Sequence, residues 1–128
     1  MLRSLLASVA LLLALTAAPA HARHGDHGGD NDVRVTGTCG RGATAKLRLK
    51  SEDSRIEVRF EVEHIRFAGR WRVTIAQEGR VAYRGRYRAR RSFEIRRDLN
   101  DLAGADRVTV RAVGPRGLTC AAAATLPG

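Results

Sequence analysis

The sequence predicts an all-β protein, an antiparallel β-sandwich of seven to eight strands. Two observations lead to this fold class. After the first 32 residues, apolar and polar residues alternate in short runs, as they do along strands with one buried and one solvated face. Breaks that contain Gly, Asp or Ser separate these runs at intervals of about 8 to 12 residues, which is the turn spacing of a sandwich.

Residues 1–22 have the organisation of a secretory signal peptide. Arg3 precedes an apolar run that begins at Leu5 and ends at Leu15, and small residues lead up to Ala22, after which cleavage is expected. The run is shorter than the roughly 20 residues that a membrane-spanning helix needs. We therefore expect a secreted protein that is not embedded in a membrane.

Removing 22 of the 128 residues leaves 106, the size of one small domain. Residues 23–32 contain no apolar residue and predict a disordered polar tail, while residues 33–126 predict the sandwich. The tail has five side chains able to bind a metal ion weakly: His24, Asp26, His27, Asp30 and Asp32. We interpret the tail as a polar spacer and predict no metal site.

Cys39 and Cys120 are the only cysteines, and export to an oxidising environment favours a disulfide between them. Such a bond closes a loop over most of the domain, for which chain entropy gives a stabilisation of roughly 4 to 5 kcal/mol. The alternatives are two unpaired thiols or a bridge between two molecules. The cysteines lack the Cys-x-x-Cys spacing of redox catalysts.

Eight alternating segments are expected to form strands. They are residues 33–38, 43–50, 55–63, 70–76, 80–88, 92–97, 107–113 and 118–126. Leu47, Val58 and Phe60 are among the inward residues of the second and third segments, which form the strongest predicted pair. The outer face of that pair is mixed in sign, because Lys and Arg alternate there with Glu.

In a hairpin, inward residues of one strand must face inward residues of the other, and this requirement suggests the length of two loops. A three-residue loop at residues 77–79 sets Val73 opposite Tyr83, so that inward residues face each other. A four-residue loop at residues 51–54 sets Arg48 opposite Glu57. The connection at residues 98–106 is rich in Asp and Asn, which we interpret as turn formers rather than calcium ligands.

Three features point to a known architecture: the strand that contains Trp71, the corner at residues 102–106, and the final hairpin. Their order resembles immunoglobulin-like and fibronectin type III-like domains. The resemblance implies one sheet formed by residues 43–50, 55–63 and 92–97. It implies a second sheet formed by residues 70–76, 80–88, 107–113 and the last strand. First and last strands can be neighbours in such domains, so a Cys39–Cys120 bond is geometrically reasonable.

The chain is strongly basic, with 23 Lys and Arg against 13 Asp and Glu, and its net charge of +10 falls to +9 when Arg3 leaves with the signal peptide. Alternation directs many arginines to the outer face of the second sheet. The candidate anion-binding residues are Arg70, Arg72, Arg84, Arg86, Arg88, Arg107 and Arg111. Residues two apart in a strand lie about 6.6 to 6.8 Å apart, within the roughly 8 Å screening length at physiological salt.

The predicted role is a secreted binding module for an anionic cell-wall polymer, an acidic glycan or an acidic protein, because guanidinium groups suit phosphate and carboxylate. The oligomeric state stays open. In the alternative interpretation, Arg abundance reflects GC-rich coding. The chain is then an exported structural domain, or a protein-interaction or inhibitor module, with no dedicated anion site.

Catalysis and specific nucleic-acid binding are not predicted. The folded region has one histidine, His64, and few serines, which do not assemble a nucleophile with a base. Hence no catalytic residue and no cofactor are assigned. The aromatic side chains of Trp71, Tyr83 and Tyr87 are all expected to point inward, so the basic face has no stacking platform for bases.

Overall fold

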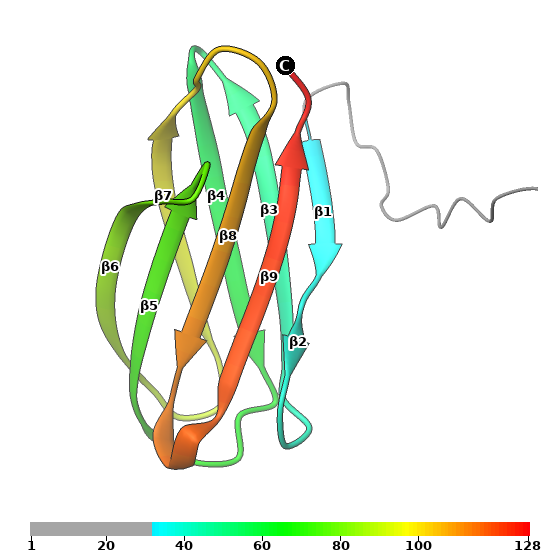
Figure 1. Ribbon diagram of the computed structural model, residues 1–128. Helices are drawn as coiled ribbons and strands as arrows, with labels where there is room; N and C mark the ends of the chain where they lie inside the picture. The colour runs from blue at the N-terminus through cyan, green and yellow to red at the C-terminus, as the bar shows by residue number, and fades with distance from the viewer. Residues whose placement is uncertain (1–31) are drawn as a thin grey trace, which may run out of the picture.

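The computed structural model describes residues 32–128, which form two antiparallel sheets packed face to face (Figure 1). In spatial order, the four-stranded sheet contains β1 (Asp32–Thr36), β3 (Thr44–Glu52), β4 (Arg55–Glu63) and β7 (Phe93–Asn100). The five-stranded sheet contains β2 (Thr38–Cys39), β9 (Thr119–Leu126), β8 (Asp106–Val113), β5 (Gly69–Gln77) and β6 (Arg80–Ala89). A single 3₁₀ turn, η1 (Pro115–Gly117), joins β8 to β9.

The predicted all-β sandwich is confirmed, with nine strands within residues 32–128 in place of seven or eight. The predicted division of the strands between the two sheets is also correct. The signal peptide and most of the polar tail lie outside the described residues. The predicted end of that tail is wrong by one residue, because Asp32 begins β1 and pairs with Lys50.

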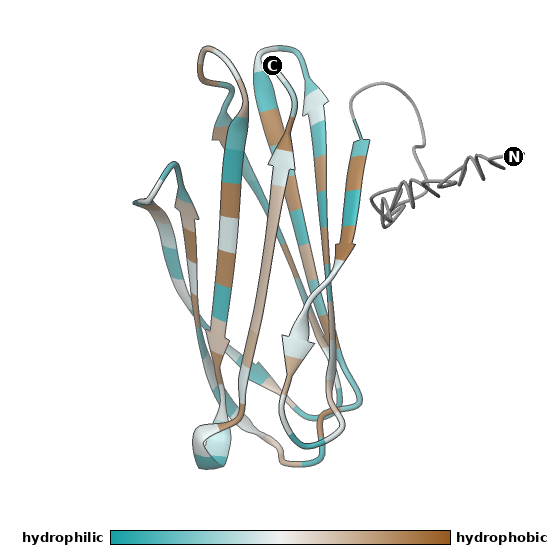
Figure 2. Cartoon of the chain, turned by 45° about the vertical axis from the view of Figure 1, so that its right-hand side comes forward, coloured by the Kyte–Doolittle hydropathy of each residue, from teal (hydrophilic) through white to brown (hydrophobic). Residues whose placement is uncertain are grey.

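The core lies between the sheets and consists of the apolar residue at every second strand position. Figure 2 shows this alternation as hydrophobic and hydrophilic bands along the strands. The largest fully buried side chains include Trp71, Phe60, Leu47, Leu49, Ile56 and Ile75. Period-two burial explains why the inward residues were predictable: strand geometry sends successive side chains to opposite faces.

The first predicted strand is in fact two, because the chain crosses from one sheet to the other at Gly37. Residues before Gly37 pair with β3, whereas Thr38 and Cys39 pair with β9. A Cβ atom on Gly37 would lie 2.4 Å from the carbonyl oxygen of Ala121. Only glycine allows the backbones to approach so closely at the crossing.

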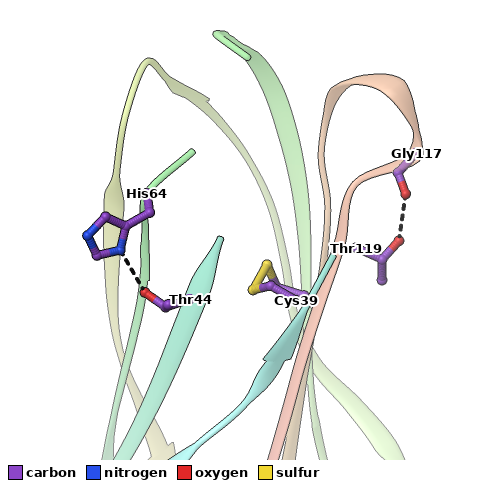
Figure 3. Close-up of a disulfide and its surroundings, with 6 residues drawn as sticks. Cys39, Thr44, His64, Gly117 and Thr119 are labelled. Atoms are coloured by element: carbon purple, nitrogen blue, oxygen red, sulfur yellow. Dashed lines mark hydrogen bonds between the residues drawn. A yellow bond between two sulfur atoms is a disulfide. The ribbon is translucent and has the colours of Figure 1, made fainter. Parts of the chain in front are cut away.

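The predicted disulfide is present and joins β2 to β9 (Figure 3). Cys39 and Cys120 stand directly opposite each other in the ladder, with their Cα atoms 4.1 Å apart. The loop that they close spans a sequence separation of 81 residues. β2, the second part of the predicted first strand, lies next to the last strand, β9, which makes this bond compatible with the sheet.

Both predicted hairpin loops are too long, and the register derived from each is wrong. Asp53 and Ser54 adopt φ values of 49° and 65°, which makes the β3–β4 connection a two-residue turn of the type I′ family. Arg48 consequently lies opposite Arg59 rather than Glu57. Lys50 is the residue that faces Glu57.

The β5–β6 hairpin also has a two-residue turn, formed by Glu78 and Gly79 with φ values of 50° and 77°. A β-bulge beside Ile75 and Ala76 inserts one extra residue on β6. Because of this extra residue, inward positions of β5 again face inward positions of β6, as they would with a three-residue loop. Val73 therefore faces Gly85 instead of Tyr83.

The connection before β8 is shorter than predicted. β7 continues to Asn100, so Asp98 lies within a strand and Asp106 begins the next one. Asp106 is buried and accepts a hydrogen bond of 3.1 Å from Nε2 of Gln77. Burial, reinforced by the nearby Asp101, raises the pKa of Asp106. In the described part of the chain, no group of three or more acidic, His or Cys side chains is arranged to hold a metal ion.

Candidate anion-binding surface

All seven predicted arginines are exposed on the outer side of the five-stranded sheet, on β5, β6 and β8. We define this set as the arginine face: Arg70, Arg72, Arg84, Arg86, Arg88, Arg107 and Arg111. The sheet register brings six of them into three adjacent rows. Arg70 faces Arg88, and Arg72 faces Arg86. Thr74 lies between Arg84 on one side and Arg111 on the other.

Arg107 is separate from these rows, at the end of β8 beside the β5–β6 turn. Its backbone N–H donates to the Glu78 carboxylate, and its carbonyl accepts a 2.9 Å bond from the Glu78 N–H. Its neighbour on β9 is Thr125. Glu78 is the only carboxylate of the β5–β6 hairpin. The structure therefore assembles six of the predicted residues and sets the seventh next to an acidic group.

The two outer faces differ in how their arginines are paired. Every ion pair found among residues 32–128 joins side chains of the four-stranded sheet. Its basic members are Arg34, Arg48, Arg55, Arg59 and Arg96. The arginine face has none of these pairs, so its guanidinium groups have no carboxylate of residues 32–128 within 4.0 Å.

Pairing on the four-stranded sheet is strong enough to shift acid pKa values. Its central row contains four arginines in register, from Arg34 across to Arg96, with acidic side chains beside it. Hydrogen bonds from Arg96 and then Arg59 lower the pKa of Glu94 to about 2. The mixed sign predicted for this face is confirmed, and its positive charge is largely neutralised locally.

Two hollows lie on the outer side of the five-stranded sheet. The first, of about 460 Å³, has Thr74 and Val113 in its lining and four surrounding arginines: Arg72, Arg84, Arg86 and Arg111. The second, of about 650 Å³, is lined by small side chains such as Ala76, Thr109 and Ala121. Thr74 and Arg111 belong to both hollows. The basic region thus continues into an uncharged surface of Ala and Thr.

The aromatic side chains predicted to point inward do so. Trp71 is fully buried, and Tyr83 and Tyr87 pack against the core while staying partly exposed at its edge. No aromatic residue is among the lining residues of either hollow. These two hollows therefore have no ring on which a nucleic-acid base could stack.

Arg97 is a residue near this edge that sequence reasoning did not single out. Its Nη2 donates a 2.8 Å hydrogen bond to the Tyr83 hydroxyl, and its guanidinium carbon lies 4.2 Å from the centre of that ring. A hydrogen bond with Tyr87, followed by those from Arg97, lowers the pKa of Tyr83. Burial raises the pKa of Tyr87. The sequence contained one signal for this position: Phe93 and Ile95 are inward residues, so alternation also directs residue 97 to the inner face.

His64 lies in the loop after β4, where it is exposed as predicted. Its Nδ1 is 3.2 Å from the hydroxyl of Thr44 (Figure 3). Both side chains are at the disulfide end of the sandwich, where His64 also lines a hollow of about 610 Å³ together with Glu63 and Ser92. The contact is that of a loop histidine with a neighbouring strand.

Comparison with models of protein families, with curated proteins and with solved structures finds no match to this chain. Within residues 32–128, no helix has the length and apolar character needed to cross a bilayer.

Proposed function

We propose that this protein is a secreted, non-catalytic domain that binds anionic extracellular ligands through the arginine face. The observation that supports the proposal most is the grouping of six exposed arginines in three adjacent rows, without ion-pair partners in the described part of the chain. An export signal in the sequence and a disulfide are consistent with an extracellular site of action. Nothing in the candidate surface requires a cofactor.

The physical basis is a local positive field. The backbone positions that carry these arginines are about 4.8 Å apart between adjacent strands and about 6.6 to 6.8 Å apart, two residues on, along one strand. These spacings are shorter than the Debye length of roughly 8 Å, so the fields add. A single exposed ion pair contributes only about 0 to 1 kcal/mol. Useful affinity therefore needs a ligand with several negative groups that meet several arginines together.

The alternative is an exported structural or interaction domain in which these arginines only keep the sheet solvated. The two interpretations differ in one measurable consequence. If the rows bind ligand, removing their charge weakens retention on a polyanion more than removing equal charge elsewhere. If they only solvate the sheet, any two variants of equal net charge behave alike.

The test uses the protein on a heparin column eluted with a salt gradient. Arg72, Arg84 and Arg86 are replaced together by Gln, and the matched control replaces Lys46, Lys50 and Arg55, which are exposed on the other sheet. We expect the first variant to elute at clearly lower salt than the control, because polyanion binding depends on the number of contacting cations. An elution position shared by the two variants would reject the arginine face as the binding surface.

A further inference from the structure

β6 forms one edge of the five-stranded sheet, and it is the longest strand of the described chain, with ten residues. Figure 1 shows it as the curved outer ribbon beside β5. Beyond the bulge, the register with β5 is regular from Tyr83 to Ala89. One side of this backbone is paired with β5, and no strand of residues 32–128 is hydrogen-bonded to the other side, although β7 of the facing sheet lies near it. An edge of this kind is a template for a further strand.

The outward side chains of this edge are basic. Arg84, Arg86 and Arg88 occupy alternate positions, all exposed and none in an ion pair within residues 32–128. A second copy of β6 laid against the edge would bring like charges together, which is destabilising in cross-strand positions. A strand with carboxylates at alternate positions would instead form opposite-charge pairs. The charges thus select against self-association and in favour of an acidic segment.

The inward side chains at the same edge are aromatic and incompletely covered. Tyr83, Tyr87 and Phe93 are partly buried at the border between β6 and β7, whereas Trp71 and Phe60 in the central strands are fully buried. The Tyr87 and Phe93 rings stack with their centres 6.1 Å apart and an angle of 6° between their planes. An added strand would cover the remaining exposed parts of these rings with its own inward side chains. The contact with Tyr87 favours an apolar side chain, whereas the Arg97 guanidinium already lies over Tyr83.

We propose that the β6 edge binds, by strand addition, an extended segment of an acidic partner protein in which carboxylates alternate with apolar side chains. The inference rests on the proposed function, because Arg84, Arg86 and Arg88 belong to the arginine face. Main-chain hydrogen bonds to β6 provide affinity, and the two faces of the segment provide specificity. Carboxylates lie beside the arginines, and apolar side chains lie on the inner side of the edge, beside Tyr87.

The test compares three synthetic peptides of equal composition, each seven residues long between neutral flanks. The first alternates Glu and Val, the second groups all Glu before all Val, and the third, made in two versions, is the alternating peptide with N-methyl groups on one or the other set of alternate backbone amides. Binding is measured by calorimetry at low salt, and amide hydrogen exchange of β6 is recorded with and without peptide. We expect the alternating peptide to bind, with new protection at alternate amides of residues 83–89.

N-methylation keeps the charge and removes main-chain donors, so in one phase it should weaken binding by about tenfold or more. The peptide with all Glu before all Val should bind weakly, because as a strand it would not direct Glu to one face and Val to the other. Changing Arg84 and Arg88 to Glu should transfer the preference to an alternating Lys and Val peptide, with circular dichroism confirming that the variant folds. This variant tests strand addition in a folded protein whose β6 edge has negative instead of positive charges at two positions.

Equal binding by all three peptides would overturn strand addition and leave only charge attraction to the arginine face. Strand addition is also overturned if heparin is retained through the arginine face while the alternating peptide does not bind, because the ligand is then a polyanion rather than an extended polypeptide. Failure of the proposed function has a different signature: heparin retention that does not depend on Arg72, Arg84 and Arg86.

Discussion

The guanidinium of Arg48 on β3 holds the carboxylate of Asp32 on β1, with Nη2 at 2.6 Å and Nε at 3.0 Å from its oxygens. Asp32 is only 4% exposed, whereas Arg48 is 30% exposed. This bond anchors the first described residue of β1 to the neighbouring strand. It also accounts for a strand that begins one residue earlier than the apolar pattern predicts.

Replacing Arg48 with Gln should lower the free energy of unfolding by about 1 to 3 kcal/mol, since it leaves a nearly buried carboxylate with only the longer, 3.4 Å hydrogen bond from Arg34. The double variant, with Arg48→Gln and Asp32→Asn together, should lose less unfolding free energy than the sum of the losses in the two single variants. Chemical denaturation of the wild type, both single variants and the double variant measures this coupling. Strict additivity would show that the two side chains do not interact in solution.

The same pair predicts the direction of a pH effect. Hydrogen bonding to Arg48 lowers the pKa of Asp32 below its usual value of 3.8. The stabilisation is therefore complete above pH 3.8 and is lost as the pH falls through the lower pKa of the folded state. Between neutral pH and about pH 5 the contribution of Asp32 should stay constant, as the difference between the wild type and Asp32→Asn will show.

Glu94 should titrate at about pH 2 in the folded protein, against 4.5 for an ordinary Glu. Its favourable contribution is present above pH 4.5 and disappears as the pH falls toward 2. Replacing Arg96 with Gln removes the largest cause and should raise the pKa of Glu94, as followed by NMR of its carboxyl carbon. Arg55→Gln is the matched control, since Arg55 pairs with Asp98 and not with Glu94. A pKa unchanged by loss of Arg96 would contradict the assignment.

Repulsion between the arginines of the arginine face should lower the free energy of unfolding at low salt. Arg72 faces Arg86 and Arg70 faces Arg88, and like charges directly opposite each other in a sheet are unfavourable by roughly 0.2 to 1 kcal/mol. Arg72→Gln should therefore raise the free energy of unfolding slightly in low salt, with the gain vanishing as salt is added. Arg59→Gln on the other sheet should lower it instead, because Arg59 pairs with Glu61 and Glu94. Thermal denaturation at two ionic strengths compares them.

Gly114→Ala should destabilise the fold by about 1 to 3 kcal/mol through overpacking. A Cβ atom at Gly114 would lie 2.4 Å from the buried indole ring of Trp71. Gly40→Ala is the control, because its nearest neighbour outside the adjoining residues would be a methyl group of Leu118 at 3.6 Å, an ordinary contact. Equal stabilities of the two variants would mean that the Trp71 ring relaxes freely.

Strand alternation was sufficient to predict which side chains enter the core and how the main strands divide between the sheets. Leu47, Val58 and Trp71 each lie at the inward positions that period two assigns. The arginine face follows from the same rule, because outward residues of β5, β6 and β8 share one side. What alternation determines is the face of a residue, and this much was correct.

Alternation does not determine register, since a shift of two residues preserves every face. The predicted register of both hairpins was therefore wrong. Asp53-Ser54 and Glu78-Gly79 form turns in which both residues have positive φ, a conformation that Asp and Gly tolerate but Ser and Glu seldom adopt. The ion pairs of the four-stranded sheet depend on this register, so the contrast between a neutralised face and an unpaired one emerged only in three dimensions.

The disulfide also determines what happens to the domain under tension. The bond between Cys39 and Cys120 joins β2 to the start of β9, so the chain from β3 to β8 lies between the two cysteines in sequence. A force pulling on residues that precede Cys39 and follow Cys120 is transmitted through the sulfur bridge. Only β1 and the remainder of β9 can then be peeled away. The mechanical load bypasses β5 and β6, so the arginine rows keep their spacing while the tethered chain is stretched.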